Sequence, residues 1–182
     1  MKNKLMIVIL GVLFYNSITM ELNADSTLPQ KKVITTGMSQ EQIFNKGDKY
    51  FKEGKYEEAL AVFKRNLNNE NFVFGAATVS RLLGRYKESI KYYNILIEKN
   101  PEYAESYFGR ALSNRGIEEY GKAINDFKVV IMKAPSEYAY IGIGDLYILI
   151  GEKAKAKTML DRGVREFPNS KLLKQLRRKA YN

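Results

Sequence analysis

The sequence predicts an all-α protein, an α-solenoid of four antiparallel helix–turn–helix repeats that ends in a capping helix. A short pattern at residues 54–59 returns in varied form three times along the chain. Each copy closes on a small residue, and these four anchors are Ala59, Ser89, Ala123 and Ala156. Their intervals fall in the range of roughly 30–34 residues that is typical of stacked helical hairpins. Stacking is needed because one hairpin alone cannot bury both of its faces.

The second helix of each repeat is predicted from the residues that follow the anchor. Bulky apolar residues stand four and eight positions later, which places them on the same helical face as the anchor. They are Phe63 and Leu67, Tyr93 and Ile97, Phe127 and Ile131, and Leu160 and Val164. In the last three repeats a proline twelve positions after the anchor ends the helix, because proline cannot continue helical hydrogen bonding. These prolines are Pro101, Pro135 and Pro168.

The first helix of each repeat precedes a turn of the Gly-x-Tyr type. In the third repeat Tyr107, Ala111 and Asn114 have the spacing of one helical face. The first helix of the array is expected to start at Ser39, where Ser39 and Gln42 have the spacing of a capping box. The predicted solenoid covers residues 39–182, with repeats at about 40–69, 70–103, 104–136 and 137–168.

This arrangement resembles the tetratricopeptide repeat family, in which aromatic, Leu-Gly, Tyr, Gly-x-Tyr, Ala, aromatic, Ala and Pro recur with a period of roughly 34 residues. The match covers about residues 40–168. The fourth repeat keeps Tyr140, Gly144, Tyr147, Gly151, Ala156 and Pro168. Four features depart from the pattern: Glu118 replaces the turn glycine of the third repeat, Asn71 replaces the first proline, Ser80 replaces the tyrosine of the second repeat, and that repeat begins four residues early. The resemblance implies a helical scaffold that binds other proteins.

The N-terminus has the pattern of a secretory signal peptide over residues 1–24. Lys2 and Lys4 precede an apolar run at residues 5–15, and Ala24 is the best cleavage point. This run is too short to cross a bilayer, which needs roughly 20 residues. An uncleaved, membrane-tethering segment stays the alternative if the apolar stretch extends to Met20. Residues 25–38 are expected to be a flexible linker.

The C-terminal residues 169–182 are expected to form the capping helix. Leu172, Leu173, Leu176 and Ala180 make an apolar stripe, and basic residues occupy the remaining positions. Such a helix covers the apolar face that the last repeat would otherwise leave in water.

Composition argues against catalysis. The chain has no histidine and no cysteine, which excludes histidine acid–base chemistry, Ser-His triads, disulfides and metal sites built on either residue. The adjacent carboxylates Glu57–Glu58 and Glu118–Glu119 are assigned to helix starts, where negative charge suits the helix dipole. We therefore expect no enzyme, no cofactor and no metal.

The formal charge of +10 leaves two interpretations open. Basic residues are spread over every repeat, as expected of a solvated surface, and no continuous basic stripe favours nucleic acid. Attraction to an anionic cell-wall polymer or membrane lipid is the alternative.

The first helices carry a second stripe beside the one used for packing, and the family resemblance implies that it lines a concave groove. The stripe consists of Phe44, Asp48 and Phe51, of Phe74, Thr78 and Arg81, of Phe108, Leu112 and Arg115, and of Tyr138, Ile141, Asp145 and Ile148. Burial against the next repeat, or cover by the linker, is the alternative for these residues. Members of the family that clamp carboxylate ends use Lys, Asn and Arg here, whereas this chain has Phe44, Asp48, Glu105 and Gly109. That specificity is not expected.

The predicted function is a protein-interaction scaffold, without enzymatic activity, in the bacterial cell envelope or periplasm. A partner's helix or extended peptide would dock in the apolar groove, with Arg81 and Arg115 selecting acidic neighbours. The alternative is a basic surface that binds anionic cell-wall polymer or membrane lipid. Salt separates the two, because binding of a polymer by charge weakens with ionic strength while an apolar groove responds little.

Overall fold

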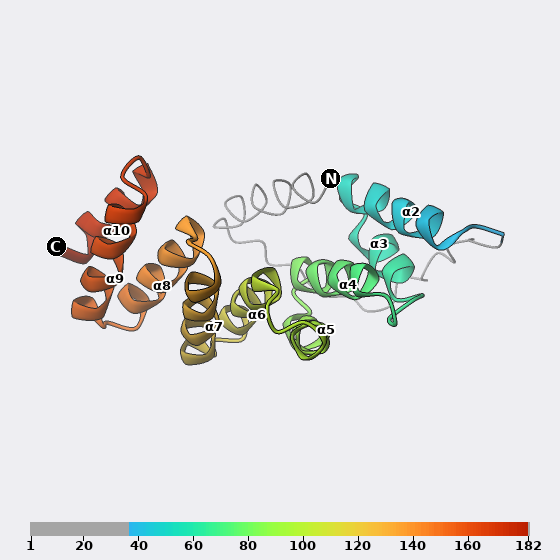
Figure 1. Ribbon diagram of the computed structural model, residues 1–182, viewed down its shortest axis with the longest axis horizontal. Helices are drawn as coiled ribbons and strands as arrows, with labels where there is room; N and C mark the ends of the chain where they lie inside the picture. Colours follow the sequence, from blue (N-terminus) through green and yellow to red (C-terminus); the bar gives the residue numbers. More distant parts are fainter. Residues whose placement is uncertain (1–36, 182) are drawn as a thin grey trace. The chain divides into compact units, whose positions relative to one another are not determined.

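The computed structural model describes residues 37–181. The predicted signal peptide and all but the last two residues of the predicted linker lie outside this range. Within it the chain forms helices and no strand (Figure 1). The helices are α2 (Gln40–Lys52), α3 (Tyr56–Phe63), α4 (Glu70–Leu82), α5 (Tyr86–Lys99), α6 (Ala104–Gly116), α7 (Tyr120–Lys133), α8 (Glu137–Leu149), α9 (Lys153–Glu166) and α10 (Lys171–Tyr181). None of these helices is long and apolar enough to cross a membrane.

The helices pack as a solenoid of consecutive hairpins, which confirms the predicted fold class. Each helix contacts the next one along the chain, and Figure 1 shows them following one another from α2 to α10. The first helices α2, α4 and α6 also contact one another in that order, so they share one side of the array. At the C-terminal end α10 contacts both α8 and α9, and it buries Leu173 and Ala180 there.

The anchor residues are small because they lie where helices approach closely. All four are fully buried. Ser89, the one polar anchor, donates its hydroxyl hydrogen to the carbonyl oxygen of Ala77 at 2.8 Å. The side chains four positions later are also buried, and they supply much of the core: Phe63, Tyr93, Phe127 and Leu160. Each of the three prolines stands two residues after the last residue of its helix, which confirms their predicted role as helix ends.

The turns inside the hairpins need one residue with positive φ. Gly54, Gly84 and Gly151 hold this position with φ of +72°, +72° and +79°. Glycine suits the left-handed region because it has no Cβ. In the third repeat Glu118 adopts the same conformation with φ of +62°, so the fold keeps the turn without the favoured residue.

The first repeat corrects one sequence-based prediction. We expected Leu67 to extend the second helix by a further turn, but α3 has only eight residues and ends at Phe63. The cause is the short interval between the anchors Ala59 and Ser89, which lacks about one helical turn that the other intervals contain. Asn69 then caps α4, and its side chain accepts a hydrogen bond from the amide of Asn71 at 2.9 Å.

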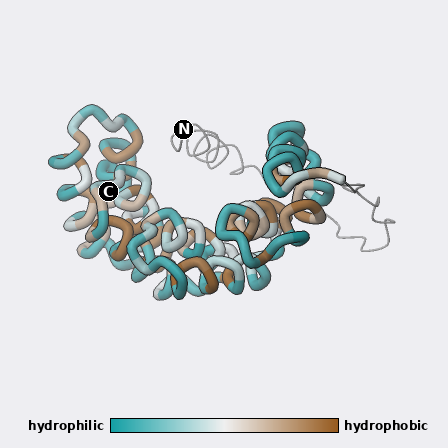
Figure 2. The backbone as a smooth tube through the Cα atoms, turned by 45° about the vertical axis from the view of Figure 1, so that its right-hand side comes forward, coloured by the Kyte–Doolittle hydropathy of each residue, from teal (hydrophilic) through white to brown (hydrophobic). Residues whose placement is uncertain are grey.

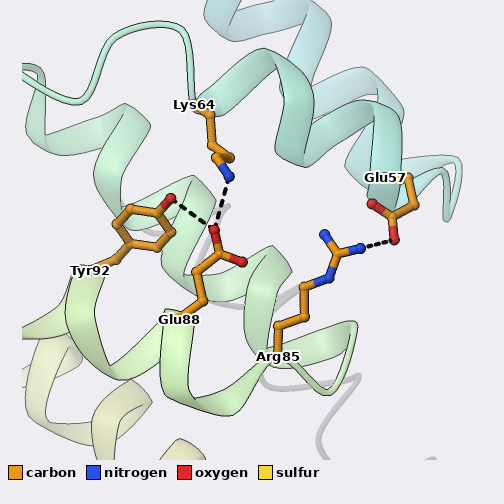
Figure 3. Close-up of polar contacts among 5 residues, drawn as sticks. All are labelled: Glu57, Lys64, Arg85, Glu88 and Tyr92. Atoms are coloured by element: carbon orange, nitrogen blue, oxygen red, sulfur yellow. Dashed lines mark hydrogen bonds and ion pairs between the residues drawn. The ribbon is translucent and has the colours of Figure 1, made fainter. Parts of the chain in front are cut away.

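Polar side chains at both ends of α3 contact side chains at the start of α5 (Figure 3). Lys64, which follows α3, donates to Glu88 at 3.0 Å, and Tyr92 donates to the same carboxylate oxygen at 3.1 Å. Arg85 donates to Glu57 at 2.7 Å. Burial alone would raise the pKa of Glu88, but the hydrogen bonds from Lys64 and Tyr92 outweigh it and lower that pKa below its ordinary value.

The start of α2 has the predicted capping box. The Ser39 hydroxyl accepts from the amide of Gln42 at 3.2 Å, and the Gln42 side chain accepts from the amide of Ser39 at 2.8 Å. The amides of Ser39 and Gln42 are therefore both satisfied, as the spacing of the two residues predicted.

The buried apolar residues form two groups rather than one. One group comes from α2 to α5 and the other from α6 to α10. Polar contacts cross between α5 and α6 where the groups meet, among them the hydrogen bond of 2.9 Å between the Ser89 and Ser113 hydroxyls. Figure 2 shows hydrophobic and hydrophilic stretches alternating along the whole described backbone, as expected of stacked repeats without a single centre.

Candidate functional site

Four apolar side chains occupy equivalent positions on the first helices: Phe44, Phe74, Phe108 and Ile141. All four are half-buried, so each presents part of its surface to solvent. We call the whole predicted second stripe, from Phe44 in α2 to Ile148 in α8, the first-helix face. These four side chains are its repeated apolar element.

Buried aromatic rings pack against the half-buried rings of the first-helix face and hold them in place. The Phe108 ring packs edge-on against Phe127 with centroids 5.4 Å apart. Phe44 lies between Phe63 and Phe72, with centroid distances of 5.5 and 5.4 Å. Such aromatic pairs add to the stability gained from burial alone. The rings are therefore fixed before any partner arrives.

Phe74 contributes to a larger aromatic surface. Its ring centroid lies 6.0 Å from that of Tyr93, which is buried, and 5.8 Å from that of Tyr103, which is 39% exposed. Tyr103 stands one residue before α6. Sequence reasoning missed it because it lies outside the helix whose periodicity defined the stripe.

A glycine allows Tyr93 to lie close beneath this surface. A Cβ added to Gly109 of α6 would stand 2.1 Å from the Tyr93 ring, far inside contact distance. Any side chain at this position would therefore displace the ring that supports Phe74. The glycine is thus explained by the close approach of the ring rather than by a turn.

Two residues of the predicted stripe are buried and not accessible to a partner. Phe51 is 8% exposed and packs against Tyr56 with centroids 6.0 Å apart. Thr78 is 4% exposed, and its hydroxyl lies 3.1 Å from the Tyr93 hydroxyl. The other members are half-buried or exposed. For Phe51 and Thr78 the structure thus matches the alternative of burial.

The charged residues of the first-helix face differ in their partners. Asp48 accepts from Lys52, one turn along the same helix, at 2.5 Å. Arg115 of α6 donates to Asp145 of α8 at 2.5 Å, so a salt bridge links neighbouring first helices. Arg81 of α4 has no hydrogen bond or ion pair with any described residue, and its Nε atom is buried without an acceptor.

Residues 37–181 contain no group of acidic side chains arranged to hold a metal ion. The sequence has no histidine and no cysteine, so the first-helix face carries neither an imidazole nor a thiol. This face presents aromatic and aliphatic side chains, the salt bridges of Asp48 and Arg115, and the unpaired guanidinium of Arg81.

Stacked helical hairpins with repeated apolar positions on one side define the α-solenoid class of binding scaffolds. Residues 138–170 match the sequence profile of the tetratricopeptide repeat. The fold agrees with a tetratricopeptide repeat protein from Parabacteroides merdae, at 24% identity and a TM-score of 0.68, over 78% of this chain and 57% of that one. It also agrees with YrrB, described as a tetratricopeptide protein with an unusual peptide-binding site, at 22% identity and a TM-score of 0.69, over 75% and 73% of the two chains.

Among curated proteins, the mitochondrial import receptor subunit TOM70 of Homo sapiens is 29% identical over 125 residues, which cover 62% of this chain and 21% of TOM70. The chain thus spans about a fifth of the length of this relative. Residues 138–170 thus contain a tetratricopeptide repeat, and the fold of the described residues is the fold of tetratricopeptide repeat proteins. Repeats of this kind generally mediate protein–protein interaction.

Proposed function

We propose that the protein is a scaffold without enzymatic activity that docks a helix or extended segment of a partner protein on its first-helix face. One observation carries this proposal: the same apolar position recurs in all four repeats and stays half-exposed each time. A residue needed only for packing between repeats would be buried, as Phe127 is. A repeated, partly exposed apolar side chain suits a partner that runs across several repeats.

The rigidity of this apolar element favours binding. Because Phe108 and Phe74 are held by the rings of Phe127 and Tyr93, little side-chain freedom is lost when a partner covers them. Aromatic anchors in such positions contribute a large share of the affinity at protein interfaces. Docking of a peptide or helix therefore needs no rearrangement of the scaffold.

Photo-crosslinking in the native cell tests the proposal directly. A photoreactive phenylalanine analogue in place of Phe74 should capture a discrete partner protein. The same analogue in place of Lys128, which is exposed on the second helix α7, is the matched control and should capture none of it. Capture from both positions alike, or from neither, would contradict docking on the first-helix face.

The proposed location is the bacterial cell envelope, and the support for it is the signal peptide pattern of residues 1–24. N-terminal sequencing of the mature protein should find a chain that begins near Asp25 in an exported fraction. Recovery of chains that still begin at Met1 from the cytoplasmic fraction would contradict export. Chains that begin at Met1 in the membrane fraction would instead support the tethered alternative.

The basic outer surface supports a second candidate function. On α10, Lys171, Lys174, Arg178 and Lys179 are exposed and have no ion pair with described residues. These side chains could attract anionic cell-wall polymer or membrane lipid. Binding of this kind should fall steeply between low and physiological salt, whereas capture of a partner through Phe74 should change little.

A further inference from the structure

The salt bridge between Arg115 and Asp145 shows that a side chain near the end of one first helix can contact the next first helix. Arg115 stands seven residues after Phe108 in α6, and Asp145 stands four residues after Ile141 in α8. The two side chains meet at 2.5 Å across neighbouring repeats. An arginine at this position therefore points along the first-helix face toward the next first helix.

Arg81 occupies the same register position one repeat earlier, seven residues after Phe74 in α4. The position that corresponds to Asp145 is Leu112 in α6, which has no acceptor to offer. Arg81 accordingly has no partner among the described residues, and its Nε atom is buried without an acceptor. A buried N–H without an acceptor lowers stability, and the penalty is greater for a charged group.

Arg81 is also placed at a fixed distance from the aromatic surface of Phe74 and Tyr103. Seven residues of helix separate the Cα atoms of Phe74 and Arg81 by roughly 10 Å, at about 1.5 Å per residue. An extended peptide covers that distance in roughly three residues, and a docked helix covers it in two turns.

From these observations we infer that Arg81 binds a carboxylate of the partner segment. The segment carries an apolar side chain that rests on Phe74 and Tyr103, and an Asp or Glu at the same separation as Phe74 and Arg81. The inference rests on the proposed function, and it narrows the partner to a segment with both features. Arg115 has no such role, because Asp145 already accepts from it.

Peptide selection with the full chain tests this inference. The probe is a display library of random 12-mer peptides, selected at about 0.15 M salt, at which surface charges are screened within roughly 8 Å. The wild-type protein should enrich peptides in which Asp or Glu stands at one fixed spacing from an apolar residue. A spacing of three would indicate an extended segment, and a spacing of seven would indicate a helix.

Variants at Arg81 should alter this preference in defined ways. Arg81→Gln should weaken binding of the best wild-type peptide about tenfold, which corresponds to about 1.4 kcal/mol, and should abolish selection for the acid while apolar selection persists. Arg81→Glu should select Lys or Arg at the same spacing. Arg65→Gln is the matched control, because Arg65 is an exposed arginine outside the first helices, and it should change nothing.

A second variant frees the paired arginine. Asp145→Leu removes the acceptor of Arg115, because leucine, the residue at the equivalent position 112, has no polar atom, and it should add a second acidic preference, one repeat further along the selected peptides. Circular dichroism would show whether Arg81→Gln folds. If it does not fold, the variant at Asp145 still tests the inference. Absence of a second acidic preference in folded Asp145→Leu would overturn the inference.

The remaining outcomes separate the inference from the proposed function. Wild-type protein that selects apolar residues without an acid would show that Arg81 is not the carboxylate site. The same follows if folded Arg81→Gln still selects the acid. In both cases docking on the first-helix face would remain supported. If no apolar residue is enriched at all, the docking surface itself is wrong, and the inference falls with it.

Discussion

Replacing Glu118 by glycine should stabilise the protein, although it removes a side chain. Glu118 holds φ at +62° in the turn between α6 and α7, where the other three repeats have glycine at +72° to +79°. A residue with a Cβ in this left-handed region is disfavoured by about 1–2 kcal/mol. The Glu118 side chain is exposed and has no hydrogen bond or ion pair with any described residue, so nothing offsets that strain.

The expected gain follows from two opposing terms. Relief of strain contributes about 1–2 kcal/mol, and the greater freedom of glycine in the unfolded chain removes about 0.5–1 kcal/mol of it. The two terms leave a net stabilisation of about 0–1.5 kcal/mol for Glu118→Gly, with a central value of about 0.75 kcal/mol. For a protein of this size the midpoint of thermal unfolding should rise by roughly 1–4 °C.

Urea unfolding followed by circular dichroism gives the free energy, and an unchanged denaturant slope would show that the unfolded state is comparable. Glu119→Gly is the matched control. Glu119 has an ordinary φ of −77° before α7 and an ion pair with Lys122, so this variant should be less stable than wild type. A Glu118→Gly protein no more stable than wild type would refute the strain argument.

Three further predictions concern the capping helix, pH and the two kinds of aromatic residue. Leu173→Ala should lower the free energy of unfolding by about 2–5 kcal/mol, because Leu173 of α10 is fully buried; an unchanged urea midpoint would contradict capping. Burial and the hydrogen bond to Glu166 raise the pKa of Tyr140 to about 12, above its unfolded value of about 10. The stabilisation from Tyr140 should therefore be complete below about pH 10 and decline as pH rises through about 12, and Tyr140→Phe should remove this alkaline loss from a series of urea midpoints. Phe127→Ala should lower stability by about 3–5 kcal/mol, whereas the half-exposed Phe74→Ala should lower it less and weaken partner binding by about 1–3 kcal/mol; equal unfolding by both would place Phe74 in the core.

The fold was predictable because its signals are local and repeated. The spacing of the anchors, the glycine turns and the prolines each act within one hairpin, and four copies exclude coincidence. The short α3 was less predictable, because helical periodicity continues to Leu67 and only the short interval from Ala59 to Ser89 shows that a turn is missing. The polar contacts of Lys64 and Glu88 that join α3 to α5 have no counterpart in the repeat pattern.

The candidate site was less predictable, because accessibility depends on contacts between repeats. Helical period alone places Phe51 and Thr78 on the same stripe as Phe74, and only packing shows that the first two are buried. The Arg115–Asp145 salt bridge joins residues 30 positions apart. That separation, close to one repeat, was the available signal for this pair.

Comparison of equivalent positions in successive repeats explains why Arg81 is unpaired. In a stack of repeats each residue contacts only its own and neighbouring repeats, so one copy shows what another could do in the same place. Asp145 in the fourth repeat turns Arg115 into a link between helices, and Leu112 in the third leaves Arg81 without an acceptor. The same exchange adds an apolar side chain to the first-helix face. Leucine in place of aspartate thus accounts for the unpaired Arg81, while Phe74 and Tyr103 supply the apolar feature of the proposed binding site.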